Sequence, residues 1–434
     1  MALTALSTSP HIPVRYSGVS PGDLPLSGWL LALLLALASS TVFVREHWPV
    51  PAFQIGVFAL LATYVVVRSR VAADRADFSV YAVGSCCILS LPVWGILQLA
   101  MGTTSSAADT WSASLRWASL AAVFFLAHRL ATGSGRRTNT NARRAFLDLF
   151  LWFATAEAVL CLTQIFTSKG QVLWLFDSGY SDFVYGTFQY YNNYAQFVEL
   201  ALPIALWRAL RDRRHGWAYA LAGGTLYASV IASASRAGSA LCTAELLAIL
   251  LIGLIRLRDP ETGAPSRSAT AMLAIVPAIA IVFTMVVGWE HVWLRFQQQD
   301  PYVVRREFLV AAVDMARQRP LTGFGLDTFP AVYQRYAIKD FPFYANHTHN
   351  DWAEFAADGG IPFLLLVLAP FLAAVPTAIR NPWGLGLIAV MLHACVDYPF
   401  PRPAVSGWMF ALLGLLYATR EAGRRPTTDP ATDR

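Results

Sequence analysis

The sequence of 434 residues is 56% hydrophobic and only 14% charged, whereas a soluble domain normally carries about a quarter charged residues. Its few charges cluster between long apolar runs, which argues against a soluble α-helical protein. The net charge of +6 reflects an excess of basic residues. In a membrane protein such an excess marks the cytoplasmic side rather than a nucleic-acid partner. We therefore expect an all-α polytopic membrane protein.

Twelve apolar runs follow one another along the chain, and a spanning helix needs about 20 mostly apolar residues. Residues 1–25 lack the basic stretch, apolar run and cleavage site of a signal peptide, so we expect the first run to be an uncleaved anchor. The run at 383–397 is the weakest, because it is short and ends in an Asp-Tyr-Pro-Phe-Pro segment. The runs cover residues 26–44, 50–68, 78–100, 114–131, 146–167, 192–209, 216–234, 238–256, 269–288, 359–379, 383–397 and 404–419.

Arginine accumulates in every second loop, which sets the expected orientation. The loops 101–113 and 168–191 on the other side hold between them only Lys169. This balance predicts twelve helices with both termini in the cytoplasm. The residues on the cytoplasmic side are Arg68, Arg70, Arg75, Arg136, Arg137, Arg143, Arg144, Arg208, Arg211, Arg213, Arg214, Arg256, Arg258, Arg267, Arg380, Arg420, Arg424 and Arg425.

One loop, at 289–358, is far longer than the others and falls on the outer side. Loops of this length are usually functional or disordered, and its many aromatic residues favour a folded segment. Amphipathic patterns predict short helices at 303–318 and 326–337. The expected organisation is nine transmembrane helices in residues 1–288, the outer loop at 289–358, three further helices in 359–419, and a cytoplasmic tail at 420–434.

The densest polar cluster closes this outer loop and contains His347, His349, Asn350 and Asp351. Three interpretations remain open. An imidazole beside a carboxylate suits a general base and its orienting partner. His-x-His with Asp also offers metal ligands, although the two side chains converge only in a turn. Alternatively, Asn350 or Asp351 is simply the N-cap of the tenth helix.

Three further features fall on the same outer face. Arg236 lies between the seventh and eighth helices, where an arginine near the apolar core indicates a functional site or a side chain snorkelling to the interface. Arg305 and Arg306 suit phosphate binding, with a surface charge pair as the alternative, preferred for Arg306. The polar entrance to the sixth helix, residues 186–194 with Asn193, lines a substrate groove or serves as an N-cap with interfacial aromatics.

These residues resemble the O-antigen ligase family, within the wider ligase/polymerase superfamily of bacterial surface polysaccharides. The family pattern of His, Asn, nine residues and Gly is matched by His349, Asn350 and Gly360. After two intervening residues the family has Gly, Thr or Tyr, and here Phe363 departs from it. Segments 305–325, 235–236 and 186–193 are also similar to family segments, so the resemblance covers about 186–365.

The resemblance implies a metal-independent, inverting glycosyltransferase of the GT-C type that uses no cofactor. Its donor would be a glycan on undecaprenyl diphosphate, its acceptor a sugar hydroxyl of the lipid A core in lipopolysaccharide biosynthesis, and its site the periplasmic face of the bacterial inner membrane. His349 is then the expected base, and Arg236 and Arg305 are the expected ligands of the lipid diphosphate. Further substrate contacts are assigned to Arg306, His347, Asn350 and Asn193.

Three alternative functions remain open. An O-antigen or exopolysaccharide polymerase uses the same donor with a growing glycan as acceptor, and a protein O-oligosaccharyltransferase is another relative. A transporter of lipid-linked sugars belongs to a different class, and we expect it to carry more buried charges within its spans. The obvious charges within the spans are Glu157, Glu199 and Glu245.

Overall fold

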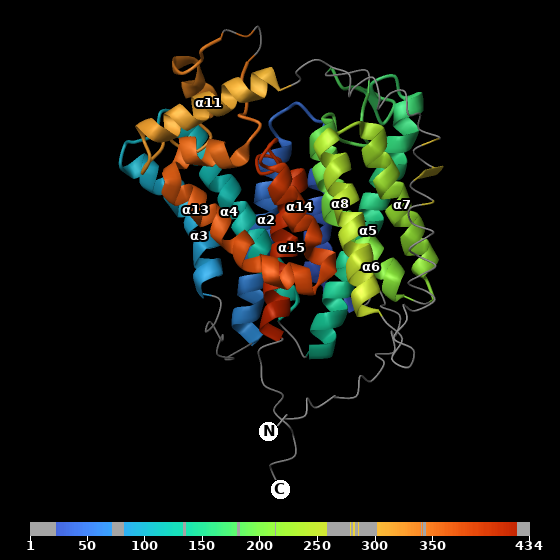
Figure 1. The fold of residues 1–434 in the computed structure, drawn as a ribbon. Coiled ribbons are helices and arrows are strands. Elements are labelled where there is room, and N and C mark those ends of the chain that lie inside the picture. The colour runs from blue at the N-terminus through green and yellow to red at the C-terminus, as the bar shows by residue number, and fades with distance from the viewer. Residues whose placement is uncertain are drawn as a thin grey trace, which may run out of the picture.

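A computed structural model describes residues 23–71, 82–132, 136–179, 183–212, 214–257, 302–339, 341 and 344–422, with isolated positions 278, 281, 282 and 285. Its elements in chain order are α1 (Leu26–Ser40), α2 (Pro49–Val71), α3 (Ala82–Ala100), α4 (Ala107–Leu130), α5 (Arg136–Thr167), β1 (Gln171–Val172), β2 (Phe176–Asp177), α6 (Tyr191–Arg211), α7 (Gly216–Ser233), α8 (Arg236–Arg256), α11 (Val303–Gln318), α12 (Phe329–Val332), η2 (Tyr333–Arg335), α13 (Asp351–Arg380), η3 (Pro382–Gly384), α14 (Leu385–His393) and α15 (Pro403–Ala422). Most of these helices run along one common axis (Figure 1).

The all-α expectation is confirmed, and eleven of the predicted apolar runs coincide with helices. The run at 269–288 lies outside the described residues except for isolated positions. Within the described part, four helices are long and apolar enough to cross a membrane: Pro49–Val67, Thr138–Thr167, α8 and α13. Shorter apolar helices are Leu26–Ser40, Gly84–Ala100 and Pro382–His393. A total of twelve spans therefore stays a prediction.

The predicted loop 168–191 contains a small structure that the apolar pattern does not indicate. Strands β1 and β2 pair antiparallel, with Gln171 opposite Asp177. This hairpin is the only sheet in the described residues, and it lies between α5 and α6.

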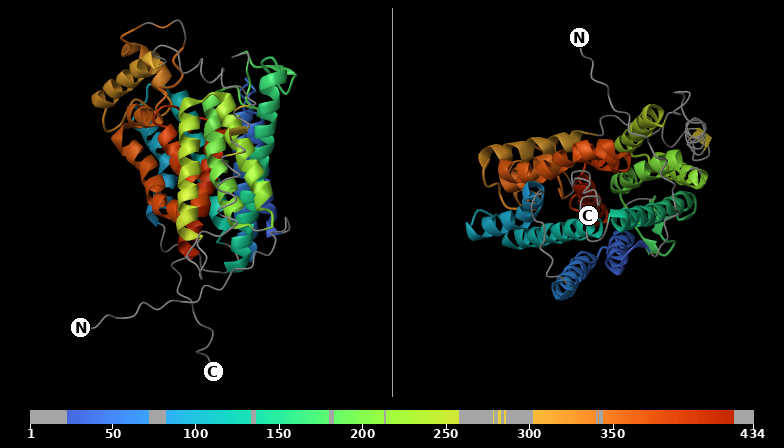
Figure 2. Two further views of the ribbon diagram at one scale, coloured as in Figure 1. Left: turned by 45° about the vertical axis from the view of Figure 1, so that its right-hand side comes forward. Right: turned by 90° about the horizontal axis from the view of Figure 1, so that it is seen from below.

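Helices α6 and α15 form the centre of the bundle. Residues 404–418 of α15 are all buried, as expected for a helix that is apolar on every face. Figure 2 shows α15 among the surrounding helices in the view from below. The Trp408 ring of α15 stacks on Phe150 of α5, with ring centroids 4.2 Å apart. Between helices of a membrane bundle such rings contribute through close van der Waals packing, because lipid is as apolar as the side chains.

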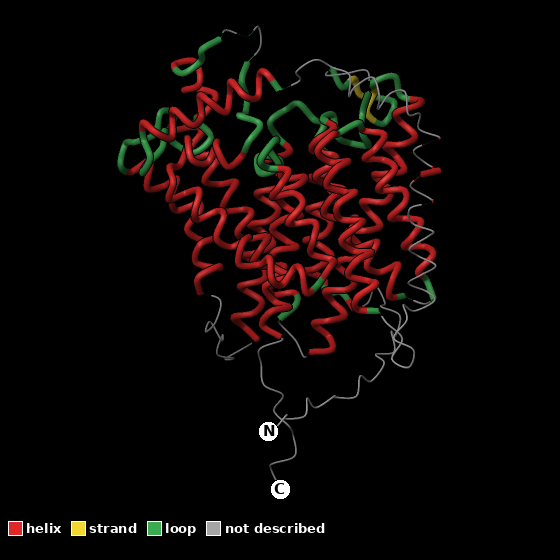
Figure 3. Tube along the Cα trace, viewed as in Figure 1, coloured by secondary structure: helices red, strands yellow, loops and turns green. Residues whose placement is uncertain are grey.

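The outer segment forms a second apolar core at one end of the bundle. Helix α11 has the predicted bounds, 303–318, whereas the predicted helix at 326–337 is the short α12 followed by the 3-10 turn η2. Phe308 of α11 packs with Phe329 and Tyr333, and Ala357 of α13 belongs to the same cluster. Most described loops gather at this end (Figure 3).

Helix α13 bends where the outer segment crosses it. Gly360 has φ +73°, and a Cβ there would lie 2.7 Å from the backbone carbon of Leu321. Gln98 of α3 holds the crossing, because its Nε2 donates to the carbonyls of Thr322 (2.6 Å) and Asp358 (2.8 Å). The predicted boundary between loop and tenth helix, residue 359, falls at this bend.

The opposite end of the bundle brings together basic residues from several helices. Arg143 of α5 donates to Thr419 of α15 (2.8 Å), and Arg256 of α8 donates to the carbonyl of Arg380 of α13 (3.1 Å). The starts of α6, α8 and α13 lie together at the other end of the bundle, which carries α11.

Candidate active site

A buried carboxylate, Asp397, lies at the centre of the polar contacts at this end. It follows α14 in the loop that leads to α15, and its side chain is 0% exposed. The Tyr190 hydroxyl donates to Oδ2 (2.8 Å), as does the Asn192 amide, and the Tyr398 backbone N–H donates to Oδ1 (3.0 Å). Arg305 of α11 makes an ion pair with Oδ2 at 3.3 Å. Residues 190–192, α11 and the loop of Asp397 itself, three separate segments, thus meet at one carboxylate.

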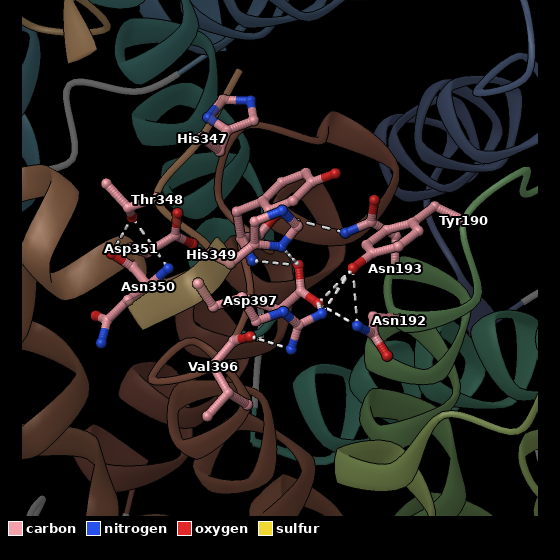
Figure 4. Close-up of polar contacts among 12 residues, drawn as sticks. Tyr190, Asn192, Asn193, His347, Thr348, His349, Asn350, Asp351, Val396 and Asp397 are labelled. Carbon is pink, nitrogen blue, oxygen red and sulfur yellow. Dashed lines mark hydrogen bonds and ion pairs between the residues drawn. The ribbon is translucent and has the colours of Figure 1, made fainter. Parts of the chain in front are cut away.

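His349 faces this carboxylate from the other side (Figure 4). Its Nδ1 lies 3.4 Å from Oδ1 of Asp397, an ion-pair distance that exceeds that of a good N–H···O hydrogen bond. The backbone has φ +56°, an uncommon conformation outside glycine that often marks functional sites. The imidazole is 24% exposed and stacks near Phe308, with ring centroids 6.5 Å apart. Its position is therefore set by a carboxylate and an aromatic ring.

The charges around Asp397 keep it ionised. Burial by itself would raise the pKa of Asp397, but the neighbouring His349 imidazole and the charge of Arg305 bring that pKa below its ordinary value. Burial and then the charge of Asp397 raise the pKa of Tyr190 well above its usual range. Tyr190 consequently stays protonated and donates to the carboxylate at neutral pH.

Arg305 is held by groups of the protein itself. Its Nη1 donates to the carbonyl of Val396 (2.9 Å) and its Nη2 to the Tyr190 hydroxyl (3.2 Å), in addition to the Asp397 contact. A guanidinium has five N–H donors, so these bonds fix its plane without using every donor. Its side chain remains 21% exposed. Arg306, in contrast, is an exposed residue of α11.

The start of α8 reaches this cluster through the entrance to α6. The Ser235 hydroxyl donates to Asn192 Oδ1 (2.7 Å) and accepts from the Gly238 N–H (3.1 Å), which caps α8. Asn192 in turn contacts Asp397. Arg236, the first residue of α8, therefore lies at the same end as His349 and Arg305, as the loop alternation predicts.

The predicted residue Asn193 is a neighbour of the contacting one. Its Nδ2 donates to Gln196 (2.9 Å) and to the carbonyl of Tyr398 (3.4 Å), whereas Asn192 touches Asp397. The side chain is 3% exposed. Asn193 thus supports the loop beside the site from within α6.

The remaining residues of the histidine cluster have separate partners. His347 Nδ1 lies 2.8 Å from Glu354 Oε1, so the two histidines face different carboxylates. The Asn350 side chain accepts from the Ala353 N–H (3.0 Å), which makes Asn350 the N-cap of α13. Asp351 accepts from the backbone N–H of Phe400 (3.0 Å). Across the described ranges, no group of three or more His, Cys, Asp or Glu side chains is arranged to hold a metal ion.

Sequence reasoning missed Asp397 and Glu354 as site residues, and it included Tyr190 only as part of the segment 186–194. A signal for Asp397 existed, because it is a carboxylate directly after an apolar run and on the outer face. No local pattern connects it to His349, which lies 48 positions earlier.

Residues 219–368 match the family model described as O-Antigen ligase. This stretch contains Arg236, Arg305 and His349, whereas the α6 entrance and Asp397 lie outside it. The match supports, for these residues, the resemblance to this family that the sequence motifs suggested. No curated protein and no solved structure matches the chain.

Proposed function

We propose that this chain, whose residues 219–368 match the O-antigen ligase family model, is a glycosyltransferase acting on a lipid-linked glycan. The donor is a glycan on undecaprenyl diphosphate, and the acceptor is a sugar hydroxyl of the lipid A core. The observation that carries this proposal is the contact of His349 with the buried, ionised Asp397. An imidazole oriented by a carboxylate is the arrangement that activates a hydroxyl nucleophile.

In the proposed reaction His349 is the general base. Asp397 faces Nδ1 and favours the tautomer with the proton on that nitrogen, so Nε2 is the atom that accepts a proton. Nε2 takes the proton of the acceptor hydroxyl as its oxygen attacks the anomeric carbon. The bond from that carbon to the diphosphate oxygen breaks, and the lipid diphosphate leaves with the electron pair. A single direct displacement of this kind inverts the anomeric configuration.

The leaving diphosphate needs positive charge, and two groups at this end supply it. Arg236 begins α8, whose N-terminal end carries the positive pole of the helix dipole. Arg305 adds a guanidinium that already contacts Asp397 and therefore has a fixed plane. Preorganised donors of this type stabilise developing charge effectively. This arrangement supports a reaction that uses no metal ion.

The bundle fits a bacterial inner membrane with the site at the periplasmic face. The end with Arg143, Arg256 and Arg380 then lies in the cytoplasm, in agreement with the preference of arginine for that side. The outer segment 289–358, which carries the proposed catalytic histidine, separates the two parts of the transmembrane region, 1–288 and 359–419.

Reconstitution of the purified protein with lipid-linked glycan and two acceptors tests the proposal. We expect product on the lipid A core, and none with His349→Ala in the same membranes. Elongated lipid-linked glycan as the sole product would identify a polymerase instead. Wild-type transfer by the alanine variant would refute the role of His349. Loss of activity with a chelator and its recovery with divalent metal would contradict the metal-independent reaction.

A further inference from the structure

A second ionisable pair lies inside the bundle, below the candidate site. Nδ1 of His393, the last residue of α14, lies 2.7 Å from Oε1 of Glu199 on α6. Both side chains are 0% exposed. Ionisable residues within a membrane bundle are costly and usually functional. The reaction described above makes no direct use of this pair.

The pair joins the two elements that position Asp397. On the α14 side, the His393 carbonyl accepts the backbone N–H groups of Val396 (2.9 Å) and Asp397 (3.0 Å). On the α6 side, Glu199 is seven residues after Asn192, which places both on one face of the helix. Asn192 donates to Asp397. The Glu199–His393 contact thus closes a ring of interactions around the carboxylate.

Stability alone does not account for this pair. Within the residues that the structure describes, Oε2 of Glu199 and Nε2 of His393 have no hydrogen-bond partner. The same is true of both carboxyl oxygens of the nearby buried Glu245. Buried ion pairs with unsatisfied atoms are often no better for stability than apolar residues of the same size. A role in the site explains their presence better.

We propose that Glu199 and His393 are positioning residues that act through Asp397, fixing its carboxylate relative to His349. This inference rests on the proposed glycosyl transfer. The charged or titratable groups facing Asp397 are His349, Arg305, Tyr190, His393 and Asp351. Among these, His393 is the one held by a buried partner on a different helix. Loss of the pair releases the end of α14, whose last carbonyl holds the backbone N–H of Asp397.

A double-mutant cycle separates this role from a general structural one. We expect His393→Leu to lower kcat by about 10–100-fold, as is typical for groups that orient a ligating or catalytic residue, with KM for the donor unchanged. In the Asp397→Asn background the same replacement should cause no further loss. An equal loss in both backgrounds would overturn the proposal.

Conservative variants and a matched control refine the test. Glu199→Gln keeps an acceptor for His393 and should retain most of the transfer, whereas Glu199→Leu should behave like His393→Leu. Ser229→Ala is the control, because it removes another buried hydrogen bond of α6, from the Tyr194 hydroxyl (2.6 Å). It should leave kcat unchanged. A loss with Ser229→Ala equal to that with His393→Leu would show that any buried contact of α6 matters.

Hydrogen–deuterium exchange tests the inference without turnover. The amides of residues 394–402 should exchange faster in His393→Leu than in wild type, and at the wild-type rate in Ser229→Ala. If wild-type protein transfers no glycan while this difference is present, the proposed function fails but the positioning pair stands. If transfer occurs and exchange at 394–402 is unchanged, the positioning pair is refuted.

Discussion

Asp397 accepts hydrogen bonds from side chains on α11 and at the entrance to α6, and faces the imidazole of His349. A buried carboxylate with several donors is held both in place and in its ionised form. Those two properties are what a residue needs in order to orient a base. We therefore expect Asp397 to control the orientation of His349, the proposed base.

Replacement of Asp397 by asparagine tests this assignment. The side chain keeps its shape and an acceptor oxygen for Tyr190, but it no longer favours the Nδ1–H tautomer of His349. We expect kcat to fall by about 10²–10⁴-fold, the range of general base catalysis. The measurement is single-turnover transfer in proteoliposomes. A loss below about threefold, far short of that range, would contradict the role of Asp397.

Comparison of wild type with Asp397→Asn also tests how the stability of the protein depends on pH. Because the pKa of Asp397 is lowered on folding, its ionised form stabilises the protein above the unfolded value of about 3.9. That contribution is lost as the pH falls through the folded pKa. The difference in Tm between wild type and Asp397→Asn should be constant above about pH 5 and shrink below about pH 4. A difference that grows on acidification would contradict this sign.

Arg305→Lys tests geometry against charge. Lysine keeps the positive charge, but its single ammonium group cannot reach Val396, Tyr190 and Asp397 with the planar fork that arginine uses. We expect Arg305→Lys to recover little of the transfer lost in Arg305→Ala. Initial rates of both variants at equal membrane content give the comparison, and near-complete recovery would mean that charge alone suffices.

Local patterns identified His349 and Arg305 because their neighbours in sequence carry the motif. Asp397 and Tyr190 were not predictable in this way. Their importance arises from contacts between residues more than 90 positions apart, such as Arg305 with Asp397. Asn193 was predicted in place of Asn192, since composition identifies a polar helix entrance without fixing which side chain points inward.

At the scale of elements, periodicity was most informative where one face of a helix is buried. Helix α11 has the predicted bounds because its buried residues, including Phe308 and Met315, recur on one side. Helix α13 begins at Asp351 instead of 359, because its first turns are capped by Asn350 and covered by the outer segment. The β1–β2 hairpin was missed because each strand has only two residues.

The bend of α13 predicts a strong effect at Gly360. Alanine there would adopt φ +73° and place its Cβ against the Leu321 backbone. Gly102 is the matched control, since it has φ +63° but open space around its Cβ position. We expect Gly102→Ala to cost about 1–2 kcal/mol from the backbone conformation alone, and Gly360→Ala to cost more and to reduce transfer. Thermal unfolding and activity of both variants decide this, and equal destabilisation would show that the close contact is relieved by small shifts.

At the scale of the whole molecule, the two ends of the bundle differ in chemistry. One end carries His349, Asp397 and the outer segment, and the other gathers arginines from α5, α8 and α13. The contacts therefore show a bundle whose two ends differ, with the candidate site at one of them. Which end faces the cytoplasm is predicted from the loop charges. The orientation is therefore predicted from the sequence, and labelling of residues at the two ends can test it.

Cysteine labelling tests the orientation of the whole chain. In a background with the five native cysteines replaced, Ile338→Cys would report the outer segment, where the side chain is 71% exposed. His215→Cys would report the opposite end, where that side chain is 55% exposed before the start of α7. A membrane-impermeant maleimide should label Ile338→Cys in intact spheroplasts and His215→Cys only after permeabilisation. The reverse pattern would place His349 in the cytoplasm, away from a periplasmic acceptor, and would rule out transfer to the lipid A core at that face.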